Sequence, residues 1–150
     1  MFEKNIIFLD ESFNNQEEVF SFLSSKLVEA GLVKDNFLEK IIEREITYPT
    51  GLQIGESGVA IPHTDSKYVN SSQIAFVSLT EPVLFYDMAD ASKTVPVSKV
   101  FMLALKEPGE QLETLQQLIE LFQNEQVMGS LGEAKSVSEV KEILLQSGLK

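Results

Sequence analysis

Hydrophobic residues recur along this chain in two patterns, one typical of buried strands and the other of amphipathic helices. Apolar runs predict strands over residues 5–9, 58–61, 73–79, 83–86 and 95–105. The last run is the longest, and we expect it to lie near the centre of a sheet. Pro96 must then fall at its start, because proline cannot donate a hydrogen bond within a sheet.

Apolar side chains spaced about four residues apart predict helices between and after these strands. Asn14 or Asn15 can cap a first helix, and Gly31 ends it. Asp35 is the expected cap of a second helix, which ends near residues 44–46. Three more helices are predicted over residues 108–124, 125–131 and 137–147. Because strands and helices are interspersed, we expect an α/β fold, a mixed β-sheet sandwiched between helices on both faces.

Composition narrows the class of protein. The chain has 150 residues, the size of one domain spanning 1–150, and 43% of them are hydrophobic, enough for a core without disulfides. It has no cysteine, which excludes thiol nucleophiles and is compatible with the cytoplasm. The net charge of -11 disfavours nucleic acid and anionic membranes as partners. Residues 1–12 do not predict a signal peptide, and no run reaches the ~18 apolar residues of a spanning helix, so we expect no membrane insertion.

Motifs for common cofactors are missing from the sequence. The glycines between residues 51 and 58 do not match a nucleotide-binding fingerprint, and together with Pro49 they predict a loop over 47–58. With one histidine and no cysteine, a zinc site would need almost all of its ligands from carboxylates. We therefore expect no metal and no cofactor.

The single histidine, His63, lies where chemistry is expected. It follows Pro62 at the end of the predicted strand 58–61. Proline should end the strand there and present the next side chain at the edge of the sheet, and the carboxyl ends of strands are where α/β folds bind ligands. Taken alone, the residue permits two interpretations, a functional imidazole or a histidine that only hydrogen-bonds near a turn.

Two polar residues on predicted helices are further candidates for an anion site. Arg44 lies at the end of the second helix. A cation is favoured at a helix C-terminus in any case, but a guanidinium can also bind phosphate oxygens. Gln111 precedes Leu115 by four residues and so shares the apolar face of the late helix. Its amide either turns to water or donates to an anion at the helix N-terminus.

Together these residues form a recognisable pattern. The segment R-E-x-x-Y-P-T-G-L over 44–52, followed by G-V-A-I-P-H over 58–63, resembles the IIA domain of the bacterial sugar phosphotransferase system, of the fructose–mannitol type. The likeness covers the rest of the chain, including P-G-E-Q-L-E-T-L-Q-Q-L over 108–118. The resemblance implies that His63 carries a phosphoryl group and that Arg44 lies near it. Many members have a second histidine where this chain has Gln111, and glutamine there is similar to the galactitol branch. Glutamine can donate a hydrogen bond but cannot titrate.

The resemblance implies a phosphoryl carrier, a phosphotransferase component with a covalent phosphohistidine intermediate. The implied donor is the phosphocarrier HPr, the implied acceptor is a cysteine of a sugar-specific IIB protein, and the glutamine suggests galactitol as the sugar. In such chemistry a neutral imidazole nitrogen attacks phosphorus in line. Two alternatives stay open. One is a regulatory IIA-like module that binds target proteins according to its phosphorylation state, and the other is a binding domain in which His63 is unused.

Overall fold

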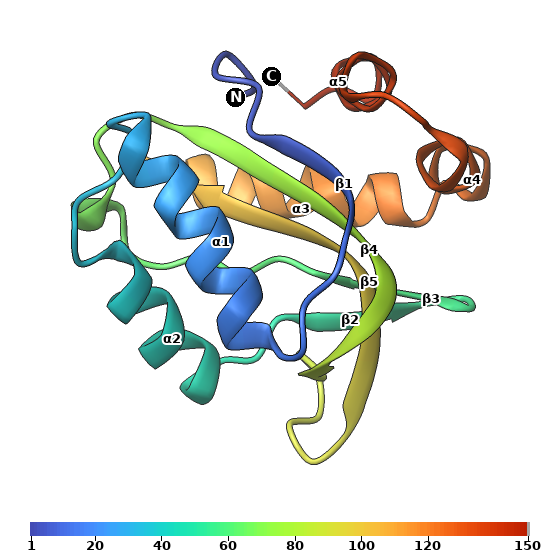
Figure 1. Ribbon diagram of the computed structural model, residues 1–150, viewed down its shortest axis with the longest axis horizontal. Helices are drawn as coiled ribbons and strands as arrows, with labels where there is room; N and C mark the ends of the chain where they lie inside the picture. The colour runs from blue at the N-terminus through green and yellow to red at the C-terminus, as the bar shows by residue number, and fades with distance from the viewer. Residues whose placement is uncertain (150) are drawn as a thin grey trace.

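A computed structural model of the chain describes residues 1–149. Figure 1 shows one twisted sheet with helices packed against both of its faces, which confirms the expected α/β architecture. The strands are β1 (Ile7–Glu11), β2 (Gly51–Ile54), β3 (Ser57–Ala60), β4 (Gln73–Tyr86) and β5 (Thr94–Ala104). The helices are α1 (Gln16–Glu29), α2 (Phe37–Thr47), α3 (Glu110–Phe122), α4 (Glu125–Glu133) and α5 (Val137–Gln146), with a short 3-10 turn, η1 (Ser66–Tyr68).

The sheet is mixed, and its strand order β1-β4-β5-β3-β2 places β5 at the centre, as its long apolar run predicts. β1 pairs with β4 and β3 with β5 in parallel, whereas the β4–β5 and β2–β3 pairs are antiparallel. A central strand covered on both faces needs apolar side chains on both, which explains why β5 reads as one continuous run. Pro96 is exposed near the start of β5.

Two hydrophobic cores lie on opposite faces of the sheet. α1 and α2 cover one face and contribute Phe20 and Phe37 to its core, while α3, α4 and α5 cover the other, which contains Phe122. Adjacent residues of β5 divide between them, Val100 on the first face and Phe101 on the second. This division follows from the alternation of side chains along a strand.

The prediction of a loop over 47–58 was wrong, because β2 and the turn into β3 lie within it. Glycine and proline are depleted in strands, so their high density in residues 47–58 favoured a loop where β2 forms. Here the glycines serve the hairpin. Gly55 adopts a positive φ of 59° in the turn. At Gly58, an added Cβ would collide with the backbone carbonyl of Pro96 on β5.

The separate strands predicted over 73–79 and 83–86 are one strand, β4. Its pairing with β5 is irregular between Ser78 and Val83, where the sequence Thr-Glu-Pro interrupts the apolar run. A bulge changes the register of a strand without ending it, so a local break in the pattern does not imply two elements.

One of the two predicted helix caps was wrong. The side chain of Asn15 accepts a hydrogen bond from the Glu18 N–H at 3.0 Å and caps α1, as expected. α2, however, follows Asn36 rather than Asp35, and no side chain caps it. Its stability comes instead from burial of Phe37 and Ile41 against α1 and the sheet.

Replacing Gly58 by alanine should lower the free energy of unfolding by about 3 kcal/mol, because the Pro96 carbonyl belongs to the central strand and has no room to withdraw. Chemical denaturation measures the change. Gly129→Ala in α4 is the control, since nothing lies within 4 Å of the added Cβ and alanine favours a helix by about 1 kcal/mol. Equal stability of Gly58→Ala and the wild type would show that β3 and β5 do not approach this closely.

Candidate functional site

His63 lies just beyond the carboxyl end of β3, beside the carboxyl end of β5, as the sequence predicts. Its backbone makes a parallel bridge with Leu103, whose N–H donates to the Pro62 carbonyl at 2.9 Å. Leu103 belongs to the core beneath α3. Bridged residues of neighbouring strands point to the same face, so His63 points to the α3 side of the sheet.

One hydrogen bond orients the His63 ring. Its Nδ1 lies 2.8 Å from the carbonyl oxygen of Ile61, and the residue is only 8% exposed. A carbonyl can only accept, so in the neutral ring Nδ1 carries the proton and Nε2 carries the lone pair. Burial lowers the pKa of His63; the Ile61 bond opposes this shift and the charge of Arg44 reinforces it. The ring is therefore neutral near pH 7, with Nε2 as its nucleophilic atom.

Arg44 lies in the last turn of α2, within electrostatic reach of the His63 ring. Its guanidinium is 3.8 Å from the Asp65 carboxylate and 4.9 Å from the centre of the Tyr48 ring. Its Nε is buried without a partner among the described residues. A partly exposed ion pair of this kind contributes at most about 1 kcal/mol. Arg44 can therefore exchange Asp65 for another anion at little cost.

Two cavities adjoin the Thr64–Asp65 segment that follows the histidine. One, of about 240 Å³, is lined by Arg44 and Tyr48. The other, of about 300 Å³, is lined by Gln111 and the residues that lead into α3. Thr64 and Asp65 line both. The fold thus brings the two predicted phosphate ligands to the segment next to His63, and the contact of Gln111 with a phosphate stays a prediction.

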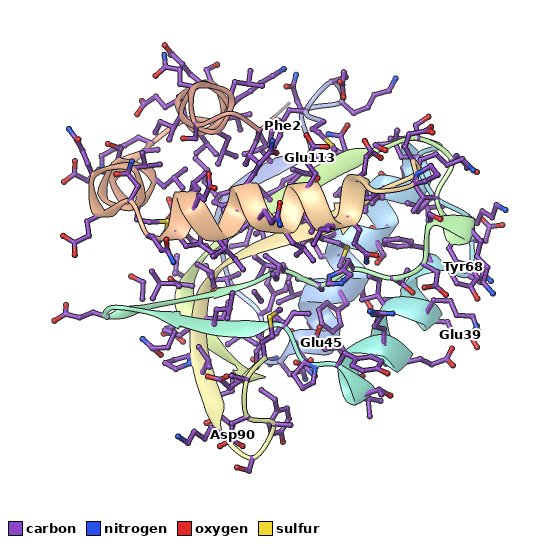
Figure 2. All side chains as sticks on the ribbon, turned by 180° about the vertical axis from the view of Figure 1, so that it is seen from behind. Phe2, Glu39, Glu45, Tyr68, Asp90 and Glu113 are labelled. Atoms are coloured by element: carbon purple, nitrogen blue, oxygen red, sulfur yellow. The ribbon has the colours of Figure 1, made fainter. Side chains whose placement is uncertain are left out.

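Glu45 is a residue of this region that the sequence reasoning missed. It is 5% exposed, and its carboxylate accepts the Thr50 N–H at 2.8 Å and the Thr50 hydroxyl at 2.9 Å. Figure 2 shows it directed into the molecule, whereas Glu39 of the same helix lies at the periphery. Burial raises the pKa of Glu45 to about 7, against the opposing effect of the Thr50 bonds. The available signal was the motif R-E-x-x-Y-P-T-G, which contains both residues.

Residues 1–149 contain neither a cluster suited to a metal ion nor a helix suited to crossing a membrane. No group of three or more histidine, aspartate or glutamate side chains there is arranged to hold a metal ion. No helix in that range is both long and apolar enough to cross a membrane.

The mixed sheet with helices on both faces, and a buried histidine after Ala-Ile-Pro at the ends of two parallel strands, define a domain of the IIA class. A family model described as "Phosphoenolpyruvate-dependent sugar phosphotransferase system, EIIA 2" matches residues 1–147, and the chain belongs to this family. The family predicted from the motifs at 44–52 and 58–63 is thereby confirmed.

Individual relatives agree with this assignment. The galactitol-specific EIIA component of Escherichia coli (strain K12) is 31% identical over 80% of this chain and 79% of that protein. The crystal structure of mannitol IIA from Escherichia coli has a TM-score of 0.75 at 26% identity, covering 93% of this chain and 96% of that one. The nitrogen regulatory protein IIA-Ntr from Neisseria meningitidis has a TM-score of 0.74 at 31% identity, covering 93% of both chains.

The raised pKa of Glu45 predicts a pH-dependent stability. The folded protein holds this proton more tightly than the unfolded chain, so the resulting stabilisation is complete below pH 4.5 and is lost as the pH rises to about 7. The shift corresponds to about 3 kcal/mol. Urea unfolding across this window should therefore show the wild type losing stability relative to Glu45→Gln, which cannot titrate. A constant difference between the two proteins would contradict the shift.

Proposed function

We propose that this chain, as one IIA domain over residues 1–150, is a cytoplasmic phosphoryl carrier. His63 accepts a phosphoryl group from phospho-HPr and passes it to the cysteine of a sugar-specific IIB component. The observation that carries the proposal is the bond from Nδ1 of His63 to the Ile61 carbonyl at 2.8 Å, which leaves the lone pair on Nε2. Membership of the EIIA 2 family supports the choice of partners.

In the first step the Nε2 lone pair attacks the phosphorus of the donor phosphohistidine in line. The new N–P bond forms at Nε2 as the N–P bond of the donor breaks, and the donor nitrogen keeps that electron pair. Nδ1 retains its proton and its bond to Ile61 throughout, so the step needs no proton shuttle. In the second step a IIB thiolate attacks the phosphorus, an S–P bond forms, and the electron pair returns to Nε2.

Arg44 and Gln111 would stabilise the charge of the phosphoryl group. Arg44 is the only arginine of the chain, and its planar fork has a buried Nε free of other partners among the described residues. Gln111 lies in the first turn of α3, where the N–H groups have no intrahelical partners and the helix dipole is positive. Its side-chain amide can donate to a phosphoryl oxygen, but unlike a histidine it cannot titrate.

We propose galactitol as the transported sugar. Gln111 in place of the second histidine supports this choice, as does the 31% identity to a galactitol-specific EIIA component. The sugar itself would bind a membrane component of the system and not this chain.

A regulatory module is the second candidate function. The observation that favours it is the 31% identity to the nitrogen regulatory protein IIA-Ntr over 93% of the chain. Both functions use the same phosphohistidine, so phosphorylation of His63 does not separate them. Transfer from the phosphorylated chain to a galactitol IIB protein would do so, because a purely regulatory module has no IIB acceptor.

We expect His63 to be the only phosphorylation site. The chain has no other histidine and no cysteine, so incubation with phospho-HPr should give one acid-labile phosphate per molecule. His63→Ala should give none while keeping the circular dichroism spectrum of the wild type. Label that persists in this variant would end the proposal.

Arg44→Lys should slow phosphoryl transfer from phospho-HPr by about 10-fold or more, because lysine keeps the charge but loses the bidentate fork. Rapid-quench kinetics measures the rate. Lys135→Arg, the reverse exchange at an exposed position between α4 and α5, is the matched control and should leave the rate unchanged. A wild-type rate for Arg44→Lys would show that Arg44 is only a cation favoured at the C-terminus of α2 and does not contact the phosphate through its guanidinium fork.

A further inference from the structure

The β2–β3 hairpin has an incomplete pair of backbone hydrogen bonds beside the histidine. Its antiparallel register pairs Gly51 with Ala60, and the same register places Thr50 opposite Ile61. The Ile61 N–H donates to the Thr50 carbonyl at 3.3 Å. In an antiparallel pair of this kind the two residues normally exchange both of their hydrogen bonds. The second bond would run from the Thr50 N–H to the Ile61 carbonyl.

Glu45 binds the donor of that second bond. The Thr50 N–H donates to Oε2 of Glu45 at 2.8 Å, and the Thr50 hydroxyl donates to Oε1 of the same carboxylate at 2.9 Å. The Ile61 carbonyl accepts instead from Nδ1 of His63 at 2.8 Å. When it is ionised, the Glu45 carboxylate is a stronger acceptor than the Ile61 carbonyl, since hydrogen bonds to charged groups are roughly twice as strong as neutral ones.

Burial limits these polar groups to hydrogen-bond partners from the protein. Glu45, Thr50, Ile61 and His63 are exposed by at most 8%. Buried polar groups of this kind take their hydrogen-bond partners largely from the protein, and an unpaired one is costly. If position 45 offered no acceptor, the Thr50 N–H would find the Ile61 carbonyl directly opposite it. That oxygen would then be shared between the ladder and the imidazole.

We propose that Glu45 is a positioning residue for His63: by withdrawing the Thr50 N–H from the β2–β3 ladder, it leaves the Ile61 carbonyl to hold the imidazole in the tautomer with its lone pair on Nε2. The consequence for catalysis rests on the proposed phosphoryl transfer. The hydrogen-bond arrangement does not, and it can be measured in the unphosphorylated protein.

The test uses the chain's one histidine, whose imidazole nitrogens give unambiguous ¹⁵N NMR signals. In the wild type at a pH where the ring is neutral, Nδ1 should show the shift of a protonated nitrogen and Nε2 that of an unprotonated one. Glu45→Leu retains bulk but offers no acceptor, so the tautomer protonated at Nε2 should gain population. Phosphoryl transfer from phospho-HPr should slow by about 10-fold or more, because a smaller fraction of the molecules has the lone pair on Nε2, where the phosphorus is attacked.

Two variants control for a merely structural effect. Glu45→Gln retains an oxygen that can accept the Thr50 N–H, so it should keep the wild-type tautomer. Glu39→Leu removes the same charge from the exposed first turn of α2 and should change neither readout.

If circular dichroism shows that Glu45→Leu does not fold, Thr50→Val tests the same link, because it deletes the hydroxyl that holds the Glu45 carboxylate. It should shift the tautomer partly, whereas Thr50→Ser should not.

A folded Glu45→Leu or Thr50→Val protein with the wild-type tautomer and the wild-type transfer rate would overturn the proposal. So would a wild-type ring protonated at Nε2. A tautomer shift in Glu45→Leu, in a protein whose wild type takes no phosphate from phospho-HPr, would instead refute the proposed function and leave the positioning role of Glu45 standing.

Discussion

Parallel pairing of β3 with the central strand β5 is the constraint on which the site depends. It requires glycine at position 58, where the backbones meet, and it continues beyond β3 through the bond from the Leu103 N–H to the Pro62 carbonyl. Pro62 has no N–H of its own, but the next residue, His63, keeps the register by bridging Leu103 and is presented at the ends of two parallel strands. A shift of one residue in this register would turn the histidine to the opposite face of the sheet.

Burial acts in opposite directions on the two titratable groups beside this pairing. It lowers the pKa of His63 and keeps the ring neutral, which suits a nucleophile. It raises the pKa of Glu45 to about 7, so the carboxylate costs stability near neutral pH. Under the proposed positioning role, this cost is retained because the carboxylate competes with the Ile61 carbonyl for the Thr50 N–H. With an apolar residue at position 45, the Thr50 N–H would complete the ladder, and the Ile61 carbonyl would be shared between the ladder and the ring.

The cation of the site is held loosely, in contrast to the histidine. Arg44 is the one arginine in a chain of net charge -11, and it is paired only with the exposed side chain of Asp65 among the described residues. A phosphoryl group at His63 would compete for this cation with an ion pair of small strength. Under the proposed function, the hydrogen bond to Ile61 holds His63 in a fixed orientation for attack. Arg44 can leave Asp65 and bind the incoming phosphoryl group.

Local patterns in the sequence were sufficient for the α/β class, the central position of β5, a cap at Asn14 or Asn15 and the placement of His63 after a strand, because each depends on neighbouring residues. The motif around Arg44 and His63 was sufficient for the family. The strand β2 was not predictable, since Gly51 and the flanking Pro49 and Gly55 favour a loop locally and only pairing with β3 overrides them. The proposed role of Glu45 was not predictable either, because it depends on the hairpin register that places Thr50 opposite Ile61. Strand pairing decides which backbone groups are left free, and that pairing exists only in the folded chain.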